Sequence, residues 1–273
     1  MRSFAGSRYA LRTLALGYLV LLLVLPVSMI VYYTFRDGLT PVWEALTDPS
    51  FVSALKLTLI AVGIAVPVNT IFGVMCAMAL VRRPPKHGAW LINSMIGLPL
   101  ALSPVVVGLA LVLVYGQDGW LGSWFEENGI QIIFSTPGIV LATIFVTLPF
   151  VVREVIPVLR EVGTDQDEAA WTLGASRWQT FIKVILPMIT PAIISGALLS
   201  FARALGEFGS IVVVAGNIPR RTLTAPVYVF GQIESQNQMG ASAVSVLLLT
   251  LSFTLMLLVD WIQGKRGGAH VAR

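Results

Sequence analysis

Residues 165–187 read DQDEAAWTLGASRWQTFIKVILP and form a short polar segment between two long apolar stretches. Asp165 is placed to cap the N-terminus of a short helix, with Glu168 three residues later in the capping-box position. Gly174 is placed to end that helix in a left-handed turn, and Ser176 can cap a second helix whose apolar residues recur at helical spacing. The segment therefore predicts a helix, a glycine turn and a second helix.

On both sides of this segment, the chain contains long stretches without Asp, Glu, Lys or Arg. A helix that spans a membrane needs about 20 apolar residues, and none of these stretches alternates in the manner of a β-barrel strand. We expect an all-α, polytopic membrane protein with a single domain, residues 1–273, and a cytoplasmic loop at 160–187. Six spans are predicted at about residues 13–35, 57–81, 90–115, 136–156, 188–216 and 239–261.

The composition argues against other classes of protein. Of the 273 residues, 56% are hydrophobic and 12% are charged, whereas about a quarter of the residues in a soluble domain are charged. A disordered chain is excluded and a water-soluble enzyme is disfavoured. The single cysteine, Cys76, excludes an internal disulfide, and His87 and His270 lie too far apart to indicate a metal site. We therefore expect neither catalytic residues nor a metal.

The basic residues predict the orientation in the membrane, because cytoplasmic loops carry an excess of Lys and Arg. Thirteen of the 18 basic residues fall on one side of the predicted spans, so we expect both termini in the cytoplasm. This topology also explains the net charge of +4, and no clustered basic and aromatic pattern indicates nucleic-acid binding. The thirteen are Arg2, Arg8, Arg12, Arg82, Arg83, Lys86, Arg153, Arg160, Arg177, Lys183, Lys265, Arg266 and Arg273.

The segment from Glu168 to Pro187 resembles the EAA motif of bacterial ABC importer permeases. The family pattern is Glu-Ala-Ala, three residues, Gly, nine residues, then Ile, any residue, Leu and Pro; this chain departs from it in having Val184 in place of Ile. The resemblance implies the six-helix fold of a type I importer permease and a coupling helix that inserts into a groove of a separate ATPase subunit. The residues it assigns to that interface are Glu168, Ala169, Ala170, Leu173, Gly174 and Ala175.

The energy source is expected to lie outside this chain. The sequence contains no G-x-x-x-x-G-K-[ST] phosphate loop, so it lacks that means of binding ATP. We therefore expect a permease subunit that is not itself an enzyme and has no cofactor of its own. ATP and Mg²⁺ would be held by the partner ATPase.

Two charged residues of the fifth apolar segment, Arg203 and Glu207, are four residues apart and so share one face of a helix. A lone charge at the centre of a bilayer costs roughly 2.5–3.5 kcal/mol on insertion scales, so a structural ion pair is one interpretation. The other interpretation places the pair beside the transport pathway or its gate. The candidate pathway residues are Arg203, Gly206, Glu207, Ser103 and Asn69; Thr147 and Ser200 are further polar groups that could face the pore or pack helices.

The stretch ARALGEFG at residues 202–209 resembles the oxyanion branch of these permeases, and the segments 66–73, 100–122 and 137–159 resemble its W-type sulfate/thiosulfate subunit. This resemblance implies import of sulfate or thiosulfate across the bacterial cytoplasmic (inner) membrane. The partners it implies, besides the lipid bilayer, are a T-type permease subunit, two ATPase subunits and an extracytoplasmic sulfate-binding protein. The alternatives are a molybdate or tungstate permease, an ion-gradient-driven secondary transporter and a membrane-bound enzyme.

Overall fold

The computed structural model describes residues 12–82 and 88–267, and the side chains among 12–82, 88 and 90–257. The described residues do not include the two chain ends, nor His87 and His270. The predicted cytoplasmic position of the termini therefore concerns residues outside the described part. Every regular element in the described part is a helix. In chain order they are η1 (Val20–Val24, a π-helix), α2 (Leu25–Phe35), α3 (Leu39–Thr47), α4 (Pro49–Arg82), α5 (Ala89–Ala101), α6 (Pro104–Tyr115), α7 (Gly122–Glu127), α8 (Thr136–Val162), α9 (Asp165–Thr172), α10 (Arg177–Thr180), η2 (Phe181–Ile185, a π-helix), α11 (Leu186–Leu205), α12 (Gly209–Ala215), α13 (Ala225–Glu234) and α14 (Gln238–Gly267).

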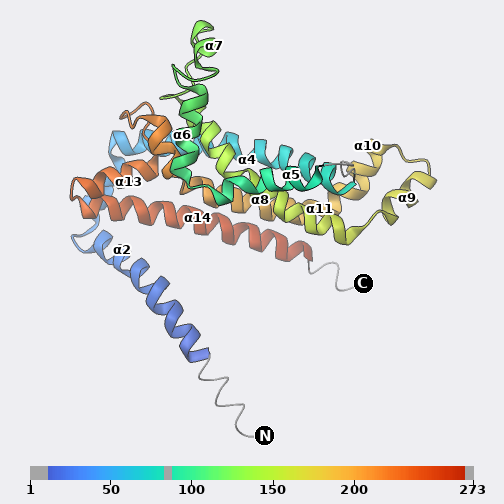
Figure 1. Ribbon diagram of the computed structural model, residues 1–273. Coiled ribbons are helices and arrows are strands. Elements are labelled where there is room, and N and C mark those ends of the chain that lie inside the picture. Colours follow the sequence, from blue (N-terminus) through green and yellow to red (C-terminus); the bar gives the residue numbers. More distant parts are fainter. Residues whose placement is uncertain (1–11, 83–87, 268–273) are drawn as a thin grey trace, which may run out of the picture.

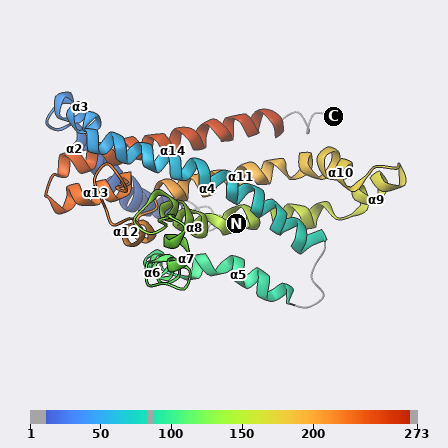
Figure 2. The same ribbon diagram turned by 90° about the horizontal axis from the view of Figure 1, so that it is seen from above.

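The core of the molecule is built from α4, α8 and α11, which lie side by side along its length (Figures 1 and 2). Small residues at their crossings let the helix backbones approach closely. A Cβ on Gly73 of α4 would lie 2.8 Å from the Cβ of Val151 in α8, and one on Gly196 of α11 would lie 2.7 Å from the Cα of Val151. Larger side chains at these two glycines would push the three helices apart.

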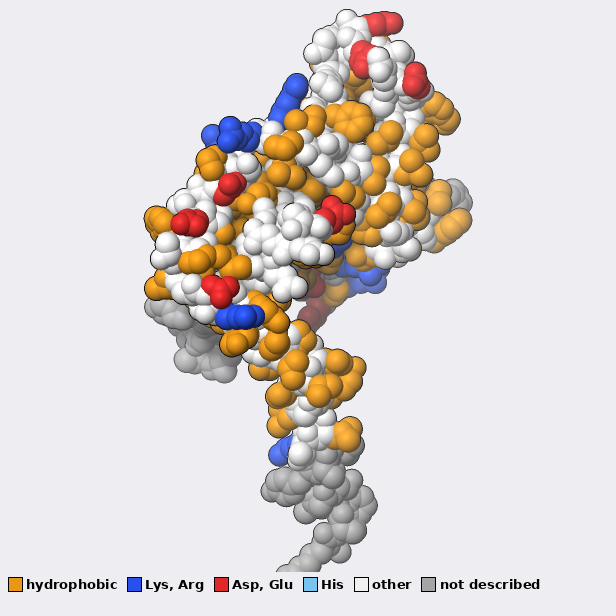
Figure 3. All heavy atoms as spheres, turned by 90° about the vertical axis from the view of Figure 1, so that its left-hand side faces the viewer, with side chains coloured by type: hydrophobic (Ala, Val, Ile, Leu, Met, Phe, Trp, Pro, Cys, Tyr) orange, Lys and Arg blue, Asp and Glu red, His pale blue; other side chains and the backbone are white. Residues whose placement is uncertain are grey.

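The N-terminal helix, Arg12–Phe35, leaves this core. No part of its most apolar 18-residue window is buried, and Figure 1 shows α2 extending away from the end of α14. Hydrophobic side chains cover it on the face seen in Figure 3. Because a helix that is apolar on all sides has to be surrounded by apolar material, lipid or another subunit must cover it.

Within the described residues, five helices are long and apolar enough to span a membrane, and a sixth is obtained if one bent helix pair counts as a single span. The five are Arg12–Phe35, Pro49–Arg82, Thr136–Val162, Arg177–Leu205 and Gln238–Leu257. Buried apolar side chains of α4, α8, η2 and α11 form one cluster in the space between these helices. The chain therefore has the apolar helices of a multi-span membrane protein.

The third span, which the sequence predicts at about residues 90–115, is broken in the structure. Its two parts, Trp90–Ala101 and Pro104–Tyr115, are bent by 112°. The cause is local: Ser103 has an extended backbone, as expected for a residue before proline, and Pro104 opens the new helix.

The fifth span, predicted over 188–216, is also interrupted. The helix α11 ends at Leu205, and α12 begins only at Gly209. At the break, the N–H of Ser210 in the first turn of α12 donates to Oε1 of Glu207, a contact that a continuous helix would not offer because this N–H would bond within the helix. The segment predicted as the fifth span, about residues 188–216, thus contains two helices, α11 and α12.

Candidate functional site

The first candidate region is the helix α9 with the turn that follows it, at one end of the bundle (Figure 1). The helix begins one residue earlier than the sequence predicts: the carbonyl of Thr164, not of Asp165, accepts the first helical hydrogen bonds, from the N–H groups of Asp167 and Glu168. The predicted capping role of Asp165 is therefore wrong. Asp165 instead lies in the first turn, where its charge suits the positive end of the helix dipole.

The turn after α9 has the predicted form. Gly174 has a φ of +83°, in the left-handed region, and the N–H of Ala175 donates to the carbonyl of Ala170. Ser176 and Gln179 then form a capping box: the N–H of Ser176 donates to Oε1 of Gln179 at 2.8 Å, and the N–H of Gln179 donates to Oγ of Ser176 at 3.3 Å. The predicted helix, glycine turn and second helix are confirmed.

Most of the six residues assigned to an ATPase interface are exposed on this end of the molecule. Glu168, Ala169 and Gly174 are exposed, and the side chain of Leu173 is 88% exposed. Two tryptophans, Trp171 and Trp178, add further exposed apolar surface. An apolar surface of this kind next to an acidic residue is typical of a protein-binding site rather than of a solvated loop. Ala170 and Ala175 are half-buried beneath it.

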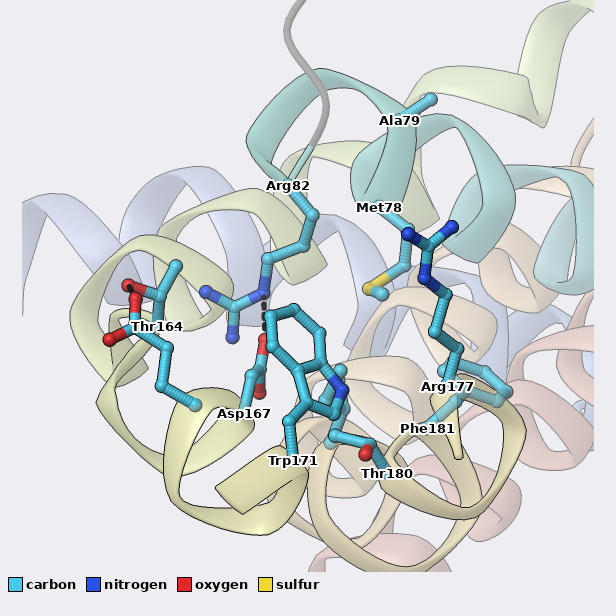
Figure 4. A pocket seen from close by; sticks show the side chains of 11 residues that line it. Met78, Ala79, Arg82, Thr164, Asp167, Trp171, Arg177, Thr180 and Phe181 are labelled. Carbon is cyan, nitrogen blue, oxygen red and sulfur yellow. Dashed lines mark hydrogen bonds and ion pairs between the residues drawn. The ribbon is translucent and has the colours of Figure 1, made fainter. Parts of the chain in front are cut away.

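The structure adds one feature that sequence reasoning missed, an ion pair between Arg82 and Asp167 (Figure 4). Nε of Arg82, in the last turn of α4, lies 3.0 Å from Oδ2 of Asp167 in α9, and Nη1 of Arg82 donates to the carbonyl of Gly163. The two side chains are 10% and 4% exposed. The sequence offered a weak signal, since Asp167 immediately precedes Glu168, but nothing in it relates Asp167 to Arg82.

A cavity of about 450 Å³ adjoins this ion pair. Its lining residues come from α4, α9, α10 and η2: Met78, Ala79, Arg82, Thr164, Asp167, Glu168, Trp171, Arg177, Thr180, Phe181 and Ile185. Burial raises the pKa of Asp167 above its ordinary value of 3.8, the guanidinium of Arg82 opposes this shift, and Glu168 adds a smaller increase.

The second candidate region lies where the fifth span is broken. Nη1 of Arg203 is 2.6 Å from Oε2 of Glu207, the pairing expected from their spacing. Glu207 is fully buried, and its Oε1 accepts hydrogen bonds from the N–H of Ser210 at 3.0 Å and from its hydroxyl at 2.7 Å. The side chain of Arg203 remains 34% exposed. Both carboxylate oxygens thus have a polar partner, Oε2 through the ion pair alone, whereas the side chain of Arg203 is only partly buried.

The breaks of the third and fifth spans lie against each other. A Cβ on Gly209, the first residue of α12, would lie 2.9 Å from the Cβ of Pro104, the first residue of α6. Ser103 is exposed beside this contact, and Gly206 and Glu207 are within three residues of it. Four of the five candidate pathway residues are therefore near one junction of two broken helices.

Asn69, the fifth candidate, lies elsewhere. It is fully buried, and its Nδ2 donates to Oγ1 of Thr147 at 2.7 Å and to the carbonyl of Ile144 at 3.0 Å. The hydroxyl of Ser200 donates to the carbonyl of Thr147 at 3.2 Å. These three polar residues join α4, α8 and α11 to one another, which makes them packing contacts inside the subunit.

Comparison with known proteins identifies the family. Residues 69–267 match the family of binding-protein-dependent transport system inner membrane components. The chain belongs to this family. As an inner membrane component it is a multi-span permease subunit of an ABC transporter, in agreement with the apolar helices and with the resemblance of the segment around Glu168.

Relatives within this family support the finer resemblance. The chain is 46% identical over 265 residues to the sulfate transport system permease protein CysW of Synechocystis, covering 97% of this chain and 95% of the relative. It is 43% identical over 254 residues to CysW of Escherichia coli K12, covering 92% and 87%. It is 41% identical over 251 residues to CysT of Synechocystis, covering 91% and 87%.

The fold of this inner membrane component is also that of solved ABC importers. The chain superimposes with a TM-score of 0.78 on a chain of a bacterial ABC transporter that imports the acidic polysaccharide alginate, covering 95% of this chain and 96% of that chain. A second structure shows an alginate transporter in complex with its pentasaccharide-bound periplasmic protein, with a TM-score of 0.75. At 17% identity both matches show the fold alone.

Proposed function

We propose that this chain is the W-type permease subunit of an ATP-driven importer that moves sulfate or thiosulfate into the cytoplasm. The observation that carries the proposal is the similarity, at 41–46% identity over nearly the whole chain, to proteins named as sulfate transport permeases. A dispersed similarity of this kind includes the helix-break junction and α9, not only the motif shared by all importers.

In this proposal α9 is the coupling helix. Glu168, Leu173 and Gly174, with the three alanines of the predicted set, would lie in a groove of an ATPase subunit. The complete importer would contain two such ATPases, which hold ATP and Mg²⁺ and hydrolyse the nucleotide, together with a T-type permease. An extracytoplasmic sulfate-binding protein would deliver the anion, and the distribution of basic residues supports cytoplasmic termini.

The junction of the two broken helices is the proposed pathway or gate. An anion near Glu207 would be repelled by a free carboxylate, but Arg203 and Ser210 engage both oxygens of that carboxylate. The partly exposed side chain of Arg203 and the hydroxyl of the exposed Ser103 would be the groups left to meet the anion, and Gly206 is the residue at which α11 ends. Asn69 is not part of this pathway, because it is enclosed by α4, α8 and α11.

The test is transport by the intact complex. A tagged chain is purified from its native membranes, the co-purifying subunits are identified, and ATP-dependent uptake of radiolabelled sulfate is measured in proteoliposomes. We expect an ATPase, a second permease and competition by thiosulfate. Competition by molybdate but not by thiosulfate would reassign the substrate, and the absence of an ATPase would refute the proposal.

The role of α9 is tested by reversing a charge. Glu168→Arg is expected to abolish sulfate uptake while leaving membrane insertion intact, because it places a cation in the proposed groove. The matched control is Glu161→Arg, which reverses another exposed charge at the end of α8, outside α9. Equal uptake by both variants would show that α9 is not the coupling helix.

A further inference from the structure

Arg82 connects three segments of the chain at the end of the bundle that carries α9. It belongs to the last turn of α4, its Nη1 donates to the carbonyl of Gly163 at the end of α8, and its Nε pairs with Asp167 in α9. Figure 4 shows the guanidinium standing directly over the carboxylate of Asp167. A single side chain thus holds the end of two core helices and the proposed coupling helix together.

The pair is buried although it lies at the end of the bundle, where the last residue of α4 meets α9. Three of its buried polar atoms, Nε and Nη2 of Arg82 and Oδ1 of Asp167, have no hydrogen-bond partner among the described residues, and Nε is held by the ion pair alone. Removing two charges from water without satisfying all their hydrogen bonds costs free energy. Apolar side chains packed at the same place would stabilise the fold at least as well as this ion pair. The arrangement therefore needs an explanation other than stability.

The surroundings of the pair indicate how it works. The cavity of about 450 Å³ lies between α9 and the end of α4, lined by Met78 and Ala79 on one side and by Trp171 on the other. Because side chains do not fill this space, apolar packing between α9 and α4 is incomplete there. The ion pair spans the two helices at this place, and we take it as the contact that fixes their relative position.

We propose that Arg82 and Asp167 are positioning residues that transmit the displacement of α9 to α4 and α8 during transport. The inference rests on the proposed function, since it takes α9 as the helix that the ATPase moves. In this arrangement a displacement of Asp167 moves Arg82 and with it the last turn of α4, a 34-residue helix that runs the length of the core. Loss of the pair would let α9 move within the cavity without moving the core.

The experiment uses the purified, reconstituted complex and measures sulfate uptake per ATP hydrolysed, a ratio that a merely structural role would not change. For Arg82→Gln and Asp167→Asn we expect this ratio to fall by about 5-fold or more, the size of a typical coupling energy, with the ATPase still co-purifying. The matched control is Asp165→Asn, which removes an exposed charge from the same first turn of α9 and should leave the ratio unchanged.

A second variant keeps the test decisive if the single variants fail to accumulate. Replacing both residues by apolar ones, Arg82→Met with Asp167→Leu, removes both buried charges together and should restore accumulation. We expect this double variant to assemble and to remain uncoupled. A ratio within about 2-fold of wild type in any accumulating variant of the pair overturns the inference. Failure of the unmodified complex to take up sulfate would instead count against the proposed function.

Discussion

The buried carboxylate of Glu207 permits a prediction that separates a structural ion pair from a transport residue. Replacing Arg203 by Met leaves a fully buried carboxylate 2.6 Å from where its cation was, with the two hydrogen bonds from Ser210 as its remaining support. Removing one partner of a buried pair costs about 3–5 kcal/mol. Glu207→Gln should cost less, about 1–2 kcal/mol, because an amide oxygen still accepts from Ser210 and the partly exposed Arg203 can reach polar surroundings.

The double variant, Arg203→Met with Glu207→Gln, gives the discriminating result. Both charges disappear together, so the stability should return to about that of the unmodified protein. If Arg203 meets the anion, uptake should nevertheless remain low, because a charge-assisted hydrogen bond is worth about 1.5–3 kcal/mol, or about a 10- to 150-fold change in rate.

The assay combines two measurements on the same preparations. Thermal unfolding of the purified complex in detergent reports stability, and initial uptake of radiolabelled sulfate into proteoliposomes reports transport, both corrected for the amount of complex present. A double variant that is stable and transports at the normal rate would remove Arg203 from the pathway and leave the pair a structural one. A stable Arg203→Met single variant would refute the electrostatic reasoning itself.

Three further predictions concern the packing and the α9 region. Gly196→Ala should destabilise the complex by about 1–3 kcal/mol, since its Cβ would lie 2.7 Å from Val151, whereas Gly63→Ala, with no atom within 4 Å, should be neutral or stabilising in thermal unfolding. Gly174→Ala should cost about 1–2 kcal/mol at a φ of +83° and weaken ATPase retention in co-purification, with Gly174→Asn milder. Because the pKa of Asp167 is raised, the native state binds the proton of this carboxyl more tightly than the unfolded state does. The group therefore contributes most to stability below its ordinary pKa of 3.8, and this contribution is lost as the pH rises through the raised pKa. The stability of the unmodified protein relative to Asp167→Asn should therefore fall over that range, and an unchanged difference would contradict the assigned burial.

Local patterns in the sequence were sufficient to predict the helix, turn and helix around Gly174. The capping box at Ser176 and the pairing of Arg203 with Glu207 depend on residues three or four apart, and such short-range geometry is nearly fixed once a helix forms. The position of the first cap was missed by one residue because Thr164 and Asp165 are both good capping residues. The apolar stretches likewise indicated membrane helices without revealing their neighbours.

Such short-range patterns do not predict the helix breaks or the Arg82–Asp167 pair. The sequence between 90 and 115 contains no charged residue and is predominantly apolar, so hydropathy does not predict a bend of 112° within it. Pro104 lies at the break, but Pro99 inside α5 and the prolines inside α4, α8 and α11 do not break their helices, so a proline alone does not predict it. Arg82 and Asp167 are 85 residues apart, and their contact depends on how α4 and α8 pack.

The polar contacts inside the core relate the two candidate regions to each other. Asn69 and Arg82 lie on α4, about 20 Å apart along the helix axis. Asn69 bonds to Thr147 of α8, and Thr147 in turn accepts from Ser200 of α11, which is one turn before Arg203. Because an unsatisfied polar group in the membrane interior is costly, these bonds resist sliding of the three helices past one another.

The core helices should consequently move as one body, and the flexibility required for transport has to lie elsewhere. The breaks at Ser103 and at residues 206–208 are where the backbone leaves the helical path, and they lie in contact with each other through Gly209 and Pro104. A displacement of the core toward or away from α6 and α12 would change that contact first. Glu207 lies in the second of these breaks and pairs with the partly exposed Arg203, so we expect the flexible part of the fold to include the cation that would meet the anion.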